Sequence, residues 1–387
     1  MFTGPSFVAF SGVFTLGVLF SILGSVKLKL AETLNIDDTK VGSLISAMMF
    51  TCLVAVLIVG PLTDTVGYGI VALIGFALAC LSVFVLASSR NYTTALIACL
   101  VLGIAAMCAN TVGNTLGPTV LFDGQNAPRA SNLLNVFFGF GAFITPMIIA
   151  LLLNALGYKK TVGLIGIILF LPIILVALTM KQLPVPEEGF NVVKAIGLLT
   201  NPVVLVGGLA LFCYIALESS MAGFVSTYLK DLDFSDNKAT SYLSGFWIAL
   251  MAARLITAIF LTGIDPAVLV PALGLLAAVA IGLMIIAPNP ATGVFGTLLA
   301  GFAFGPIFPT LIGVCFGKTD AIAQGTAGSV FGLLFAIGLF GGIVVPPIIG
   351  NYTAKTSIRK GLQVALAVSV ALIVIGAVLW RFVPDVS

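Results

Sequence analysis

The chain has 387 residues, of which 60% are hydrophobic and 8% are charged. This composition offers too little polar surface to cover a water-soluble particle, so it excludes a soluble globular protein and indicates an integral membrane protein. The formal net charge of +3 comes from scattered residues without a basic cluster, which excludes a nucleic-acid-binding surface.

Twelve apolar stretches are long enough to cross a bilayer. An α-helix needs about 20 apolar residues to span the hydrocarbon layer, and each stretch approaches or exceeds that length. We therefore expect an all-α membrane protein with twelve transmembrane helices. In chain order the stretches cover residues 6–28, 41–62, 69–88, 94–117, 131–156, 161–180, 202–229, 239–262, 267–287, 291–316, 325–349 and 360–381.

The longest polar interval between spans covers residues 181–201 and separates two groups of six. The predicted domains are therefore a six-helix bundle over 1–180, a cytoplasmic linker over 181–201, and a second six-helix bundle over 202–387. Both groups carry Gly-Pro steps and proline-broken helices at matching places, as in Gly117-Pro118 and Gly305-Pro306. A repeat of this kind is typical of secondary transporters, whereas any single glycine is explained by close helix packing.

Glu218 stands near the middle of the seventh stretch, in a chain that contains no histidine. A charge at the bilayer centre costs roughly 2.5 kcal/mol or more, so such a residue indicates function. Three functional interpretations are open: Glu218 carries a proton, stays ionised beside a sodium ion, or accepts hydrogen bonds from a solute. A structural alternative is that it bonds the hydroxyls of Ser219 or Thr227. Tyr214 lies four residues earlier on the same helix face, within reach of the carboxylate or a ligand.

The loop after the second stretch reads Gly60-Pro-Leu62-Thr-Asp64-Thr-Val-Gly67-Tyr68-Gly69. It resembles the signature loop of the major facilitator superfamily, although the usual basic pair is replaced by Tyr68 and Gly69. We expect Asp64 to cap a helix start or to face a helix N-terminus, where an anion is stabilised by roughly 0.3 to 1 kcal/mol.

Further patterns are Ser131-Asn132-Leu-Leu-Asn135 with Gly139 and Gly141, Tyr214 and Glu218 with Gly223 and Tyr228, Phe246-Trp247 ahead of Arg254, Phe308-Pro309-Thr310, and Gly341-Gly342 with Pro346. Together these patterns resemble the fucose:proton symporter family within that superfamily. One departure is that the Asn-Asp pair common in the first span of this family is absent near Gly24. The fourth span also has no carboxylate and offers Asn110, Thr111, Asn114 and Thr115 instead.

The resemblance implies cation-coupled symport of a monosaccharide or similar small polar solute by alternating access. An amide-rich, aromatic site suits a sugar, although interhelical polar packing is an equal alternative for the amides. The candidate solute-binding residues are Asn110, Asn114, Asn132, Asn135, Tyr214, Glu218 and Trp247. Glu218 is also the candidate cation-coupling residue. Asp64, Arg129 and Arg254 are candidate gating residues, with solute binding as the alternative for Arg254.

No enzymatic arrangement of nucleophile, histidine or metal ligands is visible, so we expect a protein that is not an enzyme. We expect no cofactor or metal beyond a coupling proton or sodium ion. The open alternatives are a uniporter, an exporter of another small molecule, and a non-transporting sensor on a transporter scaffold. The family suggests a monomer.

The family also implies both termini in the cytoplasm and a place in the inner (plasma) membrane of a prokaryote. That orientation conflicts with the positive-inside tendency. Six basic residues then face the cytoplasm, namely Arg129, Lys181, Lys194, Arg254, Lys318 and Arg381, and the other eleven of the 17 lie outside.

Overall fold

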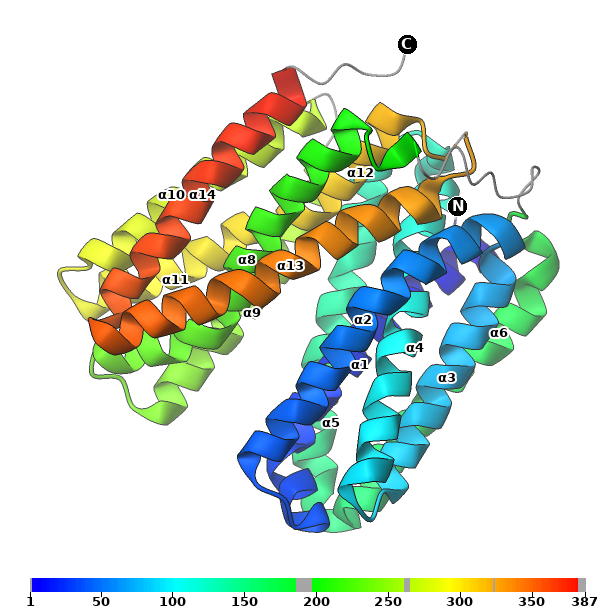
Figure 1. Ribbon diagram of the computed structural model, residues 1–387, viewed down its shortest axis with the longest axis horizontal. Helices are drawn as coiled ribbons and strands as arrows, with labels where there is room; N and C mark the ends of the chain where they lie inside the picture. Colours follow the sequence, from blue (N-terminus) through cyan, green and yellow to red (C-terminus); the bar gives the residue numbers. More distant parts are fainter. Residues whose placement is uncertain (1, 186–196, 261–264, 323, 382–387) are drawn as a thin grey trace. The chain divides into compact units, whose positions relative to one another are not determined.

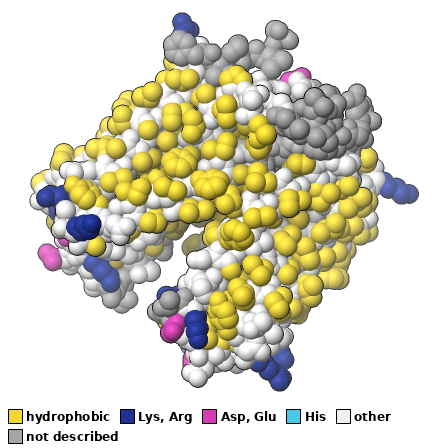
Figure 2. Space-filling view, in the orientation of Figure 1, with side chains coloured by type: hydrophobic (Ala, Val, Ile, Leu, Met, Phe, Trp, Pro, Cys, Tyr) yellow, Lys and Arg dark blue, Asp and Glu magenta, His cyan; other side chains and the backbone are white. Residues whose placement is uncertain are grey.

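The computed structural model describes residues 2–185, 197–260, 265–322 and 324–381, and every regular element in that part of the chain is helical (Figure 1). Eleven helices there are long and apolar enough to cross a membrane, which confirms the predicted all-α membrane class. On the face in Figure 2, hydrophobic side chains line the helices, while lysine, arginine and acidic side chains gather at helix ends.

The first half of the chain forms six α-helices. They are α1 (Gly4–Leu34), α2 (Asp38–Val66), α3 (Tyr68–Ser88), α4 (Tyr92–Val120), α5 (Ala127–Ile168) and α6 (Leu171–Thr179). The second half contains α8 (Pro202–Asp231), α9 (Asp236–Phe260), α10 (Pro266–Ile286), α11 (Pro290–Phe304), α12 (Ile307–Thr319), α13 (Ala327–Lys355) and α14 (Ile358–Arg381). Short 3-10 turns lie at Phe122–Gly124 and Met180–Gln182.

Capping chemistry fixes several helix starts. In α8, α10 and α11 an Asn or Asp precedes a proline, and the Asn201, Asp265 and Asn289 side chains accept hydrogen bonds from the main chain of the first turn. The cap satisfies a donor that has no partner within the helix, and proline at the first position loses nothing because its missing N–H would be unpaired there.

The twelve-helix count stays a prediction. The expected fifth and sixth spans lie in one helical run, Ala127–Gln182, which is counted once. Gly157 interrupts the run with φ 73° and ψ 168°, a left-handed φ that glycine adopts without steric cost. At about 1.5 Å per residue, the pieces on either side are each long enough to cross the hydrocarbon layer.

The chain divides into two compact units that do not follow the sequence halves strictly. Unit 1 comprises Met1–Gln125, Phe137–Ala195 and Ile322–Gly332, and unit 2 comprises Asn126–Val136, Ile196–Ala321 and Leu333–Ser387. The start of α5, residues 126–136, thus packs within unit 2, and residues 322–332 at the start of α13 pack within unit 1. We call these the α5 segment and the α13 segment. Residues 186–196 of the predicted linker, including Lys194, lie outside the described residues, and the predicted domain boundaries stay a prediction.

In unit 1, α4 packs against α1, α2 and α3. The α13 segment packs on α2 at very short range: a Cβ added to Gly328 would lie 2.3 Å from the carbonyl oxygen of Gly60, and one added to Gly332 would lie 2.7 Å from that of Val56. Only glycine allows the two backbones to approach so closely. In unit 2, α8 packs against α9, α12 and α14.

The close packing brings Asp64 to the first turn of α13, which confirms that this residue faces a helix N-terminus. Its Oδ1 accepts the main-chain N–H of Gly328 at 2.8 Å, and its Oδ2 accepts the N–H and the hydroxyl of Ser329 at 2.7 and 2.6 Å. These N–H groups have no partner within α13, and the positive end of the helix dipole favours the carboxylate.

We predict that Gly328→Ala destabilises the protein by about 1 to 3 kcal/mol, because its Cβ would force α2 and the α13 segment apart. The matched control is Gly24→Ala, whose Cβ would have no neighbour within 4 Å. Thermal unfolding of the purified protein measures both. An unfolding midpoint for Gly328→Ala equal to that of Gly24→Ala would contradict the described contact.

Candidate functional site

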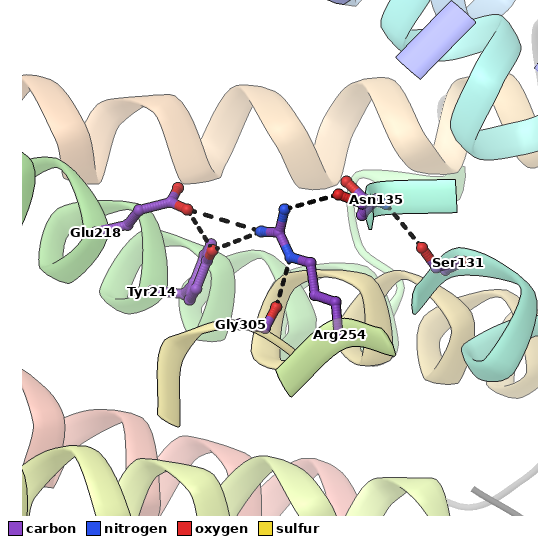
Figure 3. Close-up of polar contacts among 6 residues, drawn as sticks. All are labelled: Ser131, Asn135, Tyr214, Glu218, Arg254 and Gly305. Carbon is purple, nitrogen blue, oxygen red and sulfur yellow. Dashed lines mark hydrogen bonds and ion pairs between the residues drawn. The ribbon is translucent and has the colours of Figure 1, made fainter. Parts of the chain in front are cut away.

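The two charged residues singled out inside spans, Glu218 and Arg254, come together in unit 2 (Figure 3). Glu218 lies near the middle of α8, and Arg254 lies in α9. Arg254 Nη2 is 3.7 Å from Glu218 Oε1. The same carboxylate oxygen accepts a hydrogen bond from the Tyr214 hydroxyl at 2.7 Å. The acid of α8 is therefore held by a cation from a neighbouring helix and by a phenol from its own helix.

Helix geometry explains why Tyr214 and Glu218 meet. Residues four apart lie one turn above each other on the same face, and the phenol reaches the carboxylate there. The donor to Glu218 is thus Tyr214, rather than the hydroxyls of Ser219 or Thr227 considered from the sequence. Tyr214 is 1% exposed, whereas the Glu218 side chain is 21% exposed. The carboxylate is the accessible member of the group.

Arg254 is 2% exposed and uses all three of its nitrogens. Its Nε donates to the Gly305 carbonyl at 2.8 Å, its Nη1 to the Asn135 carbonyl at 3.1 Å, and its Nη2 to the Tyr214 hydroxyl at 3.3 Å. Tyr214 therefore accepts from Arg254 and donates to Glu218. A buried guanidinium needs this many partners because an unpaired buried charge is strongly destabilising.

The Gly305 carbonyl is available because of a helix break. Residues Gly305 and Pro306 separate α11 from α12. In a continuous helix the Gly305 carbonyl would accept from the N–H of the residue four positions later. That residue is Pro309, which has no N–H, so the carbonyl is left for Arg254.

The α5 segment contributes a main-chain carbonyl and two buried amides. The Asn135 amide donates to the Ser131 carbonyl at 2.9 Å, and the Asn132 amide donates to the Pro128 carbonyl at 2.9 Å and to the Thr310 hydroxyl at 3.0 Å. Among the described residues, Asn132 Oδ1 and the Ser131 hydroxyl have no hydrogen-bond partner. The bond from Asn132 to Thr310 joins α5 to α12, as in the interhelical alternative to sugar binding, whereas the other two bonds lie within α5.

A second polar group lies in α4 of unit 1. Asn110, Thr111, Asn114 and Thr115 are fully buried, and the Asn114 amide donates to the Asn110 side-chain oxygen at 2.8 Å. The Asn110 amide nitrogen and the Thr111 hydroxyl have no partner in the described part of the chain. This group is neutral, in contrast to the charged group of unit 2.

Two further predicted residues lie apart from the charged group. Trp247 is half-buried and packs edge to face on Phe246, with ring centroids 5.2 Å apart. Arg129 Nε donates to the Ala258 carbonyl at 2.7 Å, which joins the α5 segment to α9. The structure thus brings Asn135, Tyr214, Glu218 and Arg254 together, while Asn110, Asn114 and Asp64 belong to unit 1.

The sequence reading missed the main-chain carbonyl of Gly305 and the hydroxyl of Thr310 as partners. Pro309 was a usable signal, since a proline inside a helical run always frees the carbonyl four residues earlier. The hydroxyl of Ser329 as a partner of Asp64 had no comparable signal, because it depends on packing between residues far apart in sequence.

The arrangement is suited to reversible protonation. An accessible carboxylate that is paired on one side with a buried cation can take up a proton, and its ionised form is favoured by that cation. Among the described residues, no group of three or more His, Cys, Asp or Glu is placed to hold a metal ion.

A family model described as Major Facilitator Superfamily matches residues 8–346. Among curated proteins, the chain is 22% identical over 373 residues to a Protein TsgA homolog of Yersinia pestis (strain Pestoides F), covering 93% of this chain and 90% of that protein. The expected resemblance to a superfamily of transporters is thus confirmed.

Solved structures with the same fold include FucP. It matches as a major facilitator superfamily transporter in the outward conformation at TM-score 0.81 and 18% identity, and as the E. coli fucose:proton symporter at TM-score 0.79 and 17% identity. Each match covers 97% of this chain and 99% of that chain. The proton:xylose symporter XylE matches at TM-score 0.75 and 14% identity, covering 99% of this chain and 96% of that chain. At these identities the likeness shows the fold.

We predict that Arg254→Met destabilises the protein by about 3 to 5 kcal/mol, because it leaves Glu218 and two main-chain carbonyls without their buried cation. Adding Glu218→Gln removes the unpaired charge, so the double variant should lose less stability than the sum of the two single variants. Thermal unfolding of the wild type, the two single variants and the double variant gives the coupling energy of a double-mutant cycle.

Lys29→Met is the matched control, because Lys29 pairs with Glu32 at 2.7 Å in an exposed position and should contribute at most about 1 kcal/mol. Additive losses for Arg254→Met and Glu218→Gln would show that the two side chains do not interact.

Proposed function

Because the chain belongs to the major facilitator superfamily, whose members are transporters and not enzymes, we propose that it works by alternating access and couples the movement of a small polar solute to a proton. Glu218 carries the proton. The observation that carries this proposal is the accessible Glu218 carboxylate held against the buried Arg254 guanidinium. The protein acts as an integral, multi-pass membrane protein.

The Arg254 side chain favours a proton over a sodium ion as the coupling ion. A sodium ion bound to Glu218 would stand beside the guanidinium, which is 3.7 Å from the carboxylate oxygen and buried from solvent screening. Two positive charges about 4 Å apart repel by about 4 kcal/mol at an effective dielectric constant of 20. A proton places no second cation beside the guanidinium, and the cost of proton uptake is that Arg254 loses the negative charge next to it.

The solute we propose is a monosaccharide or a similar hydroxylated molecule. Two proteins of the same fold, FucP and XylE, are named as proton symporters of fucose and xylose. Each unit by itself offers candidate partners: the neutral amides of Asn110 and Asn114 in unit 1, and the aromatic side chains of Tyr214 and Trp247 in unit 2. Amides and aromatic faces are the partners that a sugar requires, and the internal neutralisation of Arg254 by Glu218 makes an anionic solute a poorer fit.

Gating is assigned to the contacts that hold the α5 and α13 segments. Asp64 holds the α13 segment through two main-chain N–H groups, and Arg129 and Arg254 hold the α5 segment through main-chain carbonyls. We propose that these contacts break and re-form as access alternates. We further propose a monomer in the plasma membrane of a prokaryote with both termini cytoplasmic.

We predict that Glu218→Gln abolishes accumulation of the solute against a gradient and retains passive exchange, because a glutamine amide does not take up a proton near neutral pH. The solute is first selected as the monosaccharide that most raises the thermal stability of the wild-type protein. Radiolabelled uptake into proteoliposomes with and without an imposed pH gradient then measures both activities.

The control for this experiment is Glu32→Gln, which removes an exposed carboxylate. Glu32→Gln should accumulate solute like the wild type. Accumulation by Glu218→Gln that still follows the pH gradient would refute the coupling role of Glu218.

For the gate, we predict that Asp64→Asn weakens the hold on the α13 segment by about 1 kcal/mol, a factor of about five in the docking equilibrium, since it removes the charge at the helix N-terminus. A cysteine at Thr63, which is 2% exposed, reports opening through its rate of maleimide labelling. Combining Thr63→Cys with Asp64→Asn should raise that rate about fivefold, and combining it with Glu32→Gln should not. Equal rates in the two double variants would count against Asp64 as a gate.

A further inference from the structure

Close packing and polar contacts hold the α5 segment within unit 2. A Cβ added to Gly313 of α12 would lie 2.3 Å from the Pro128 nitrogen. The polar contacts include three: Arg129 Nε to the Ala258 carbonyl at 2.7 Å, Asn132 Nδ2 to the Thr310 hydroxyl at 3.0 Å, and Arg254 Nη1 to the Asn135 carbonyl at 3.1 Å.

Of these three contacts, the one through Arg254 also reaches Glu218. The two ends of one planar guanidinium group lie against different helices: Nη1 against the Asn135 carbonyl of the α5 segment, and Nη2 against the Tyr214 hydroxyl and the Glu218 carboxylate of α8 (Figure 3). A rigid, planar group of this kind transmits a displacement at one end to the other.

We propose that Arg254 is a positioning residue that transmits the charge of Glu218 to the α5 segment. Ionised Glu218 keeps Arg254 and the segment docked in unit 2, and neutral Glu218 releases the segment. This inference rests on the proposed function, because release of the segment is taken to be a step of alternating access.

The direction of the effect follows from burial. Arg254 is 2% exposed in the docked state, so water does not stabilise its positive charge there and the nearby Glu218 carboxylate does. Once Glu218 is protonated, the buried guanidinium loses the negative charge that lay 3.7 Å away, which destabilises the docked state. Release of the α5 segment lets water reach Arg254 and removes that penalty. Proton uptake and release of the segment therefore favour each other, as linkage requires.

The charged groups around α8 support the assignment to Arg254. Helices α9, α11, α12 and α14 pack against α8. Helix α13 also packs against α8 through Gly338, Gly341 and Gly342, and its charged residue is Lys355 at the last turn. On α9, Arg254 pairs with Glu218, and on α8 itself Tyr214 contacts it. On α14, Arg359 pairs at 3.5 Å with Asp231 at the far end of α8, and Lys318 of α12 lies near Cys315. Within the described residues, Arg254 is thus the cation that responds to the charge of Glu218.

The experiment measures labelling of a cysteine placed at Ser131 on the α5 segment. Ser131 is fully buried and its hydroxyl has no partner in the described part of the chain, so replacing it with cysteine removes no hydrogen bond there and should change stability little. The six native cysteines, all buried and free, are first replaced. The rate of maleimide labelling is measured at pH 6 and pH 8 without solute. Each rate is divided by the rate for the same unfolded protein at the same pH, which removes the intrinsic pH dependence of the thiol.

With Glu218 and Arg254 intact, the normalised rate should rise about fivefold or more from pH 8 to pH 6, the lower end of usual coupling strengths. Adding Glu218→Gln should give the high rate at both pH values. Adding Arg254→Lys should abolish the pH response, because lysine keeps the positive charge but lacks the planar guanidinium that reaches both α8 and the α5 segment. A cysteine at Thr161, buried in unit 1, controls for general loosening and should label slowly throughout.

Either of two results overturns the proposal: a low rate at pH 8 for Glu218→Gln equal to that of the parent, or an unchanged pH response in Arg254→Lys. Should Arg254→Lys fail to fold, the comparison of Glu218→Gln with the parent decides alone. Because labelling needs no solute, a pH-dependent labelling pattern without any solute accumulation would refute the transport proposal and leave this inference standing.

Discussion

A buried guanidinium must have its charge and its donors satisfied, and the site in unit 2 is organised around that requirement for Arg254. The side chain is 2% exposed and contacts α8, the break between α11 and α12, and the α5 segment. Removing one partner from such a group leaves an uncompensated charge, which costs far more than a surface ion pair contributes. Three helical elements therefore contact one side chain, and the positive charge of that side chain is compensated by Glu218.

The α13 segment is held through main-chain hydrogen-bond donors, and the α5 segment is held through a main-chain acceptor. In unit 1 the Asp64 carboxylate accepts N–H groups from the start of α13, and in unit 2 the Arg254 guanidinium donates to the carbonyls of Asn135 and Gly305. The N–H groups at the start of α13 and the Gly305 carbonyl at the helix break have no partner within a helix, whereas the Asn135 carbonyl lies inside α5. Glycine contacts at Gly328 and Gly313 bring the backbones close enough for these bonds to form. The two contacts differ in one respect, since the contact through Arg254 has a carboxylate beside it that can gain or lose a proton.

The spans and several helix starts and breaks could be predicted from the sequence, because they depend on residues close together along the chain. Long apolar stretches, Asn-Pro and Asp-Pro helix starts, and the break at Gly305-Pro306 all act within a few residues. The contact between Tyr214 and Glu218 follows from their spacing of four. The pairing of Arg254 with Glu218 does not, because it depends on how α9 packs against α8. The same is true of Asn132, whose bond to Thr310 of another helix required the packed structure, whereas the bond from Asn135 to Ser131 is local to α5. The sequence separates two spans at 131–156 and 161–180, whereas the structure keeps one helical run over Ala127–Gln182 that Gly157 interrupts.

The central claim is that Glu218 alternates between a carboxylate paired with Arg254 and a neutral acid. The most direct measurement is infrared difference spectroscopy of the purified protein during a pH titration, because a protonated carboxyl has a C=O stretching band that a carboxylate lacks. We predict that such a band appears on acidification, shifts when the solute binds, and is absent from the Glu218→Gln protein. An identical difference spectrum for the wild type and Glu218→Gln would show that Glu218 takes up no proton, and it would contradict the account.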